Sequence, residues 1–230
     1  MQPVRWGVLG ASKFAREHMA PAIHMAKGAK LAALATSWAE KAQEFQEFCP
    51  DLTVHSSYDA LLADPDIDAV YIPLPNHLHV MWTLKALAAG KHVLTEKPIA
   101  MHAREIDQII VARDNARKLA AEAYMIVFHP QWQRAREIVQ SGAIGRVTHV
   151  DTAFTYDNRA DLQNIRNRAD AGGGGIRDIG AGDGHDGGAA GQVHLFGHDL
   201  DAALPPAGGD VPGRQGDAPR RQRALQRQCA

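Results

Sequence analysis

The 230-residue chain has few cysteines, few aromatic residues and no excess of charge of either sign. Its two cysteines, Cys49 and Cys229, form no CxxC pair and are too few for a disulfide framework, which is typical of a reducing cytoplasm. The 25 basic and 26 acidic residues supply no broad cationic field, so we expect no nucleic-acid partner. No apolar run approaches the ~18 residues that span a bilayer, and the N-terminus lacks a signal-peptide pattern. We therefore expect a cytoplasmic protein without a membrane partner.

The first 125 residues alternate short apolar runs with helical patterns. Between the runs, apolar residues recur at helical spacing over 39–48, 77–89 and 103–116, and Gly90 provides a C-cap for the second of these helices. This alternation predicts an α/β fold with a parallel sheet covered by helices. The candidate strands are Val4–Leu9, Lys30–Ala35, Ala69–Pro73, His92–Thr95 and Leu119–Tyr124.

The pattern changes after residue 125 and again after residue 180. Gln131–Ser141 has a helical pattern ended by Gly142, and Val147–Tyr156 alternates as a strand that opens a second sheet. Ten of the 21 glycines fall in residues 181–230, which contain no Lys, Glu, Ile, Met, Trp or Tyr. In that segment Val193–Phe196 is the one run that could form a strand, because the rest offers too little apolar surface to offset its ordering entropy.

The turn after the first strand reads Gly10-x-Ser12-x-x-Ala15. A dinucleotide site needs such a turn, because a small backbone lets the pyrophosphate approach the amides at a helix N-terminus. Gly10 and Ala15 fit this need, and Ser12 replaces the usual middle glycine but adds a hydroxyl. A tight turn without a ligand is the alternative interpretation of this motif.

The end of the second strand bears on the choice of cofactor. NAD sites generally place a carboxylate there for the ribose hydroxyls, whereas this chain has Thr36 and Ser37, with Lys41 one helical turn later. Neutral hydroxyls and a nearby cation favour NADP over NAD, although the arginine that usually binds the 2′-phosphate is missing. Ser37 as the N-cap of the following helix is the structural alternative.

Two later strand ends carry further polar residues. Pro75 keeps the chain extended, so that Asn76 can present its amide to a ring or ribose, while a metal site at His77 and His79 is disfavoured for want of a third ligand. The fourth candidate strand ends in Glu96-Lys97-Pro98. A desolvated lysine there can exchange a proton with a substrate hydroxyl as hydride leaves the neighbouring carbon, with Glu96 in cofactor or scaffold contacts.

Together these residues resemble the Gfo/Idh/MocA (glucose-fructose oxidoreductase, inositol dehydrogenase) family, in its branch of NADP-dependent sugar and dihydrodiol dehydrogenases. The resemblance covers residues 4–180 and rests on motifs that occur in the family's order. They are Gly10-Ala-Ser-Lys-Phe-Ala15, Pro73-Leu-Pro-Asn-His-Leu-His79, Glu96-Lys97-Pro98, Glu122-Ala-Tyr-Met125 with Phe128-His-Pro-Gln131, and Ser141-Gly-Ala-Ile-Gly-Arg-Val147.

The resemblance implies a Rossmann domain over residues 1–125 that binds NADP, with NAD as the alternative, and a partial α+β substrate and oligomerisation domain over 126–180. The family's catalytic lysine corresponds to Lys97 and its aspartate to Asp178. A Tyr or His follows in the family at the position of Gly182. The candidate cofactor residues are Gly10, Ser12, Lys13, Phe14, Ala15, Thr36, Ser37, Lys41, Pro75, Asn76, His79, Glu96 and Lys97.

The resemblance ends where the composition changes, so we expect residues 181–230 to be an irregular tail produced by a shifted reading frame or a sequence-assembly error, with a genuine disordered tail as the alternative. The leading interpretation of function is an oxidoreductase acting on a sugar, polyol or dihydrodiol as its small-molecule substrate. A cofactor-binding module without catalysis and a product that does not fold are the alternatives. The family's homo-oligomers are doubtful here, because their interface sheet falls in the altered part.

Overall fold

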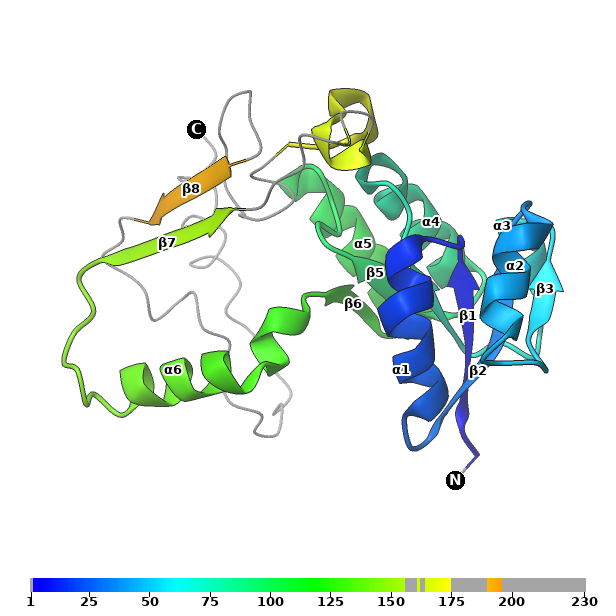
Figure 1. Ribbon diagram of the computed structural model, residues 1–230, viewed down its shortest axis with the longest axis horizontal. Helices are drawn as coiled ribbons and strands as arrows, with labels where there is room; N and C mark the ends of the chain where they lie inside the picture. Colours follow the sequence, from blue (N-terminus) through cyan, green and yellow to red (C-terminus); the bar gives the residue numbers. More distant parts are fainter. Residues whose placement is uncertain (1, 156–160, 162–163, 175–189, 196–230) are drawn as a thin grey trace.

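A computed structural model describes residues 2–155, 161, 164–174 and 190–195. Its main feature is a six-stranded sheet in the order β3-β2-β1-β4-β5-β6, with every pair of neighbouring strands parallel (Figure 1). This is the strand order of a Rossmann fold. Strands β1 to β3 are added toward one edge of the sheet and strands β4 to β6 toward the other, so the strand order reverses between β1 and β4. The strands are β1 (Val4–Leu9), β2 (Ala29–Ala35), β3 (Thr53–His55), β4 (Ala69–Ile72), β5 (His92–Glu96) and β6 (Ala120–Ala123).

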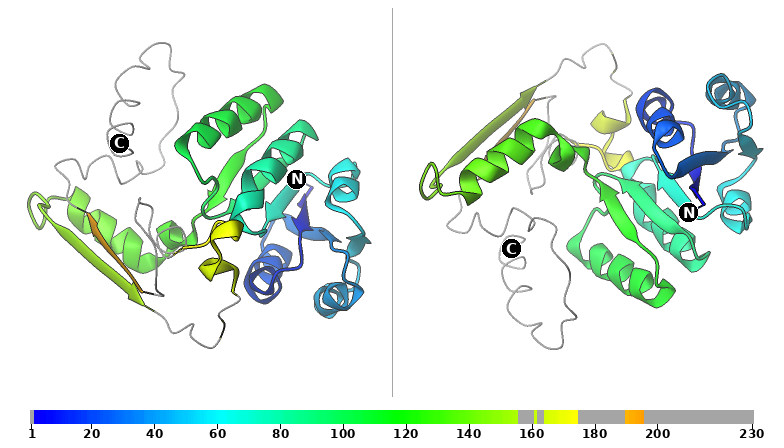
Figure 2. Two further views of the ribbon diagram at one scale, coloured as in Figure 1. Left: turned by 90° about the horizontal axis from the view of Figure 1, so that it is seen from above. Right: turned by 90° about the horizontal axis from the view of Figure 1, so that it is seen from below.

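Helices cover both faces of this sheet (Figure 2). Residues from η1, α1 and α2 form one apolar cluster with one face of the sheet, and residues from α3, α4 and α5 form a second cluster with the opposite face. Val8 and Leu9 of β1 belong to different clusters because successive strand residues point to opposite faces. The helices are η1 (Ala15–Met19), α1 (Ala20–Met25), α2 (Ala39–Gln46), α3 (Tyr58–Ala63), η2 (Asn76–Leu78), α4 (His79–Ala88) and α5 (Ala103–Ala116).

The second region lies to one side of the parallel sheet (Figures 1 and 2). In it, β7 pairs antiparallel with β8, so that Val150 lies opposite Leu195. Among the described residues, every helix is too short or too polar to cross a membrane. The elements are η3 (Met125–Phe128), α6 (Pro130–Gln140), β7 (Val150–Thr155), η4 (Ile165–Asn167), η5 (Ala169–Ala171) and β8 (Ala190–Leu195).

The structure confirms the predicted α/β fold and all five predicted strands of the first region. The observed strand ends differ from the predicted ones by at most one residue. Gly90 has the predicted positive φ, 75°, and directly follows Ala89, the C-cap residue of α4. The predicted strand over 147–156 is shorter, as β7, and the predicted strand over 193–196 is shifted, as β8. The sequence pattern predicted neither β3 nor α3. The other predictions for residues 181–189 and 196–230 lie outside the described residues.

Candidate functional site

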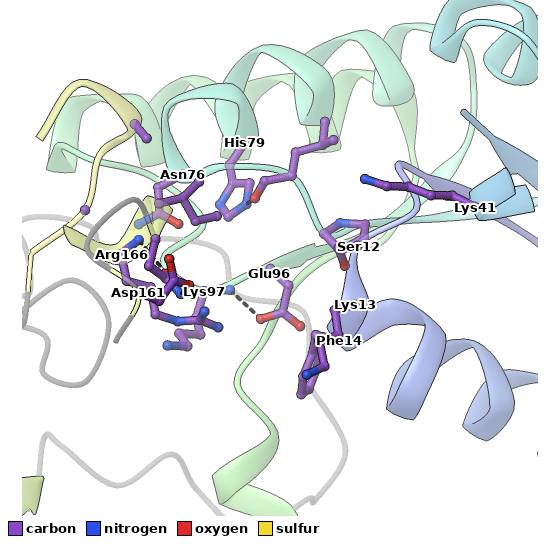
Figure 3. Close-up of a pocket in the computed structure, with 16 residues that line it drawn as sticks. Ser12, Lys13, Phe14, Lys41, Asn76, His79, Glu96, Lys97, Asp161 and Arg166 are labelled. Atoms are coloured by element: carbon purple, nitrogen blue, oxygen red, sulfur yellow. Dashed lines mark hydrogen bonds between the residues drawn. The ribbon is translucent and has the colours of Figure 1, made fainter. Parts of the chain in front are cut away.

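A cavity of about 630 Å³ opens at the carboxyl ends of the parallel strands (Figure 3). Its wall combines the turn after β1, the loop after β4, the end of β5, Asp161 and residues of the segment 164–173. Open α/β sheets bind ligands at this edge, beside the point where the strand order reverses. The predicted residues that line it are Ser12, Lys13, Phe14, Lys41, Asn76, His79, Glu96 and Lys97.

The turn after β1 begins with Gly10, whose φ of +100° is unfavourable for other residues. Gly10 is buried and donates its backbone N–H to the Ala35 carbonyl at 3.0 Å. A Cβ at this position would lie 2.8 Å from Cδ2 of Leu74, in the loop after β4. Gly10 therefore shapes the turn beneath the cavity rather than lining it.

Ser12 begins the helical run of residues 13–25 that follows this turn. Its Oγ accepts a hydrogen bond from the backbone N–H of Ala15 at 3.1 Å, as an N-capping hydroxyl does, and still has a hydrogen to donate. Ala15 is fully buried in the core. Ser12 and Lys13 thus bring a hydroxyl, an ammonium and the positive end of a helix dipole to one end of the cavity.

The residues after β2 differ from one another in their exposure. Thr36 is buried, and its Oγ1 accepts from the backbone N–H of Trp38 at 3.2 Å. Trp38 is the N-cap of α2 and makes no side-chain cap, so the alternative prediction of a cap by Ser37 is wrong. Lys41 is exposed, lines the cavity and places its Nζ 5.5 Å from the centre of the Trp38 ring.

Asn76, after β4, makes a contact that sequence analysis did not foresee. Its Nδ2 donates to the carbonyl oxygen of Gly172 at 2.9 Å, across 96 positions of sequence. Gly172 has a φ of +78°, and a Cβ there would lie 2.9 Å from Met101. Asn76 therefore anchors the segment 164–174 against the first region. This segment adds Asn164, Ile165, Arg166, Ala171 and Gly173 to the cavity wall, and Asp161 lines it as well.

The end of β5 holds Glu96 and Lys97, both half-buried in the cavity wall. One carboxylate oxygen of Glu96 accepts from the Tyr71 hydroxyl at 2.7 Å. The other accepts from the backbone N–H of Lys97 at 3.3 Å, as Figure 3 shows. Burial raises the pKa of Tyr71, and the adjacent carboxylate raises it further. Tyr71 therefore stays protonated and donates to Glu96.

His79 is fully buried at the start of α4. Its Nδ1 lies 2.7 Å from the Pro98 carbonyl oxygen and its Nε2 lies 2.7 Å from that of Leu74. Burial lowers the pKa of His79, against the opposing effect of the two carbonyls. Both ring nitrogens therefore face protein carbonyls, while His79 lines the cavity and its predicted cofactor contact stays a prediction.

Other predicted residues lie outside the cavity or outside the described residues. Pro75 precedes η2, and like Thr36 and Ser37 it does not line the cavity. Asp178 and Gly182 lie beyond the described residues. The part of the chain that the structure describes has no group of three or more His, Cys, Asp or Glu side chains that could bind a metal ion.

Comparison with known proteins identifies the family. Residues 4–124 match the N-terminal part of the Gfo/Idh/MocA family, which is described as an oxidoreductase family with an NAD-binding Rossmann fold. Residues 132–181 match the Gfo/Idh/MocA C-terminal domain. The chain belongs to the Gfo/Idh/MocA oxidoreductase family. This confirms the resemblance found in the sequence.

Among its relatives is an uncharacterised oxidoreductase of Rhizobium meliloti, 42% identical over 78% of this chain and 54% of the relative. A dTDP-3,4-didehydro-2,6-dideoxy-alpha-D-glucose 3-reductase of Streptomyces violaceoruber is 40% identical over 78% of this chain and 52% of the relative. The 3-ketoreductase KijD10 of Actinomadura kijaniata, solved with NADP and TDP-benzene, matches with a TM-score of 0.69 and 32% identity, over 77% of this chain and 54% of its own. The chain thus spans about half the length of the curated relatives it matches.

Proposed function

We propose that this chain binds NADP in the cavity and belongs to an oxidoreductase that moves hydride between the nicotinamide and a carbon of a sugar, polyol or dihydrodiol. The observation that carries the proposal is the cavity itself. It joins a helix N-terminus, at Ser12 and Lys13, to a lysine at the end of β5, at the edge of the sheet where such folds bind dinucleotides.

The residues present fit a dinucleotide phosphate. The Gly10 turn lets the chain enter the helix without a side chain in the way, and Ser12 and Lys13 offer donors to the pyrophosphate. Lys41 lies on the cavity wall beyond β2, where no carboxylate follows the strand directly, so a 2′-phosphate meets a cation rather than an anion. NADP is therefore the favoured cofactor and NAD the alternative.

Lys97 is the residue we assign to proton movement. Bound NADP(H) supplies the redox chemistry, as acceptor or donor of hydride. The Lys97 side chain lies in the cavity wall beside Asn76 and the segment 164–173, where a substrate hydroxyl or carbonyl can reach it. An ammonium there donates a hydrogen bond and then a proton to the oxygen of a carbonyl being reduced, and in the oxidative direction the neutral amine accepts that proton. From the family resemblance, we assign to Asp178 the role of orienting the substrate or Lys97.

The test is Lys97→Met, with Lys27→Met as the matched control on the exposed loop before β2. We expect turnover of NADPH with keto sugars, or of NADP with aldoses and dihydrodiols, to fall by about 100-fold or more, since general acid–base groups contribute on this order. Binding of NADPH, followed by its fluorescence, should stay within about threefold. Full turnover in Lys97→Met contradicts the role of Lys97, and loss of NADPH binding makes it a cofactor or scaffold contact instead.

A cofactor-binding module without turnover is the second candidate. It is favoured by Gly182, which stands where the family resemblance calls for Tyr or His, and by the chain's coverage of about half of its relatives. Tight NADPH binding without turnover of any substrate selects this function. No NADPH binding at all contradicts both candidates.

The substrate class is proposed from the names of two relatives. The names of the Streptomyces reductase and of KijD10 support a keto sugar carried on a nucleotide as the substrate class. A cytoplasmic location completes the proposal. We do not extend the family's homo-oligomers to this chain, because their interface sheet falls in its altered part, and an oligomeric mass in size-exclusion chromatography with light scattering would contradict this expectation.

A further inference from the structure

Two polar side chains lie fully buried beneath the loop that carries Lys97. Tyr71 comes from the middle of β4, and His79 comes from the first residue of α4. Burial of a polar group costs free energy unless it is hydrogen-bonded, and both side chains are hydrogen-bonded to the end of β5 or to the loop after it. The sequence motifs assigned no supporting role to either residue.

Tyr71 acts on the residue before Lys97. Parallel pairing of β4 with β5 puts Tyr71 opposite Leu94, two residues from Glu96, so that the ring reaches the Glu96 carboxylate. The hydroxyl donates to one carboxylate oxygen at 2.7 Å, while the other oxygen accepts from the Lys97 backbone N–H at 3.3 Å. The Glu96 carboxylate thereby connects the buried phenol to the backbone of Lys97.

His79 acts on the residue after Lys97. Its ring spans the Pro98 carbonyl, after β5, and the Leu74 carbonyl, after β4, at 2.7 Å each. Carbonyl oxygens only accept, so each contact needs a ring N–H. Burial lowers the pKa of His79 although the two carbonyls and the carboxylates of Glu96 and Glu122 oppose this, so the neutral ring donates to one of the two carbonyls at a time.

We propose that Tyr71 and His79 are positioning residues that hold the backbone of Lys97 from both sides, through Glu96 and through Pro98. This inference rests on the proposed role of Lys97. It assigns the fixed position of the lysine to two buried side chains whose polar atoms contact protein groups. Displacement of a reacting group by about 1 Å can cost on the order of 100-fold in rate, so such a support has kinetic consequences.

The kinetic test uses Tyr71→Phe, which removes one oxygen from a ring of unchanged shape, and His79→Gln, which keeps an amide donor for one of the two carbonyls. We expect each variant to lower kcat about tenfold while the KM for NADPH stays within about threefold, because the cofactor's phosphate contacts are elsewhere. Tyr124→Phe and His77→Gln are the controls, since both residues are exposed and lie outside the cavity wall. They should leave kcat and KM unchanged.

A second measurement does not depend on turnover. Brief acetylation of the intact protein, followed by peptide mass spectrometry, reports how readily each lysine amine reacts. We expect Lys97 to react severalfold faster in Tyr71→Phe and His79→Gln than in the unmodified chain, with Lys13 and Lys41 unchanged as internal references. The control variants should react as the unmodified chain does.

These readouts separate the failure of this inference from that of the proposed function. Faster acetylation of Lys97 supports the positioning role even in a chain without turnover. Unchanged acetylation of Lys97 in folded Tyr71→Phe overturns it, whatever the activity. If His79→Gln does not fold, as judged by circular dichroism, the isosteric Tyr71→Phe variant decides the question. A uniform increase in the reactivity of all lysines indicates general loosening and also overturns the inference.

Discussion

Gly10 and Asn76 differ in how far their roles in the site can be predicted from the sequence. The role of Gly10 follows from its place after an apolar strand, and its φ of +100° agrees with the predicted turn. The role of Asn76 could not be derived in the same way, because its partner Gly172 is 96 positions away and contributes only a backbone carbonyl. Gly172 was the available signal, since a Cβ there would lie within 3.0 Å of Met101 and Asn76.

The prediction on cofactor choice concerns Lys41. In Lys41→Glu, a carboxylate replaces the cation on the cavity wall after β2, so we expect the Kd of NADPH to rise about tenfold, which corresponds to about 1.4 kcal/mol. The Kd of NADH should change far less, because NADH has no 2′-phosphate. Fluorescence titration of both cofactors measures the ratio.

The matched control for this charge change is Lys30→Glu, an exposed lysine near the start of β2 and so at the opposite end of the strand. It should leave the ratio of the two Kd values unchanged. Equal weakening of NADPH and NADH in Lys41→Glu would show that Lys41 acts on a part of the cofactor that both share.

At the scale of elements, burial decides which strands the sequence predicts. All four residues of β4 are buried, so β4 has the continuous apolar pattern of a central parallel strand. The three residues of β3 form the edge of the sheet, and Val54 is its one apolar side chain and is exposed, so no pattern distinguishes β3 from a loop. The antiparallel pairing of β7 with β8 could not be predicted either, because strand pairing depends on residues that are distant in the sequence.

Arg5 of β1 and Asp68, just before β4, carry a prediction about pH. Hydrogen bonds from Arg5 to both oxygens of Asp68, at 2.9 to 3.0 Å, lower the pKa of Asp68 from 3.8 to about 2. A carboxyl whose pKa is lower in the folded state stabilises the fold above its unfolded pKa, and this contribution is lost as the pH falls through about 2. The Tm of Asp68→Asn should therefore lie below that of the unmodified chain at neutral pH and approach it at pH 2.

Thermal unfolding followed by circular dichroism across this pH range measures the difference. Asp66→Asn is the control, because that carboxyl also contacts Arg5 but is 83% exposed. It should change the Tm little at any pH, as expected for a solvent-screened ion pair. A constant offset between Asp68→Asn and the unmodified chain from pH 7 to pH 2 would show that the ionisation of Asp68 does not stabilise the fold.

At the scale of the whole molecule, the cavity depends on two regions of the chain. The first region supplies the sheet edge with Ser12, Glu96 and Lys97, and the second supplies the segment 164–173 that closes one side. A protein ending within the first region would therefore keep the dinucleotide part of the wall and lose the part beside Lys97.

Residues 181–230 carry the last prediction, that they arise from a shifted reading frame. The match to the Gfo/Idh/MocA C-terminal domain ends at residue 181. At the same point begins a segment with ten of the chain's 21 glycines and without Lys, Glu, Ile, Met, Trp or Tyr. Translation of the gene beyond codon 180 in the other two frames should give alternating strand patterns and an early Tyr or His in place of Gly182. If neither frame does, residues 181–230 are the chain's own continuation, and the proton chemistry must do without that group.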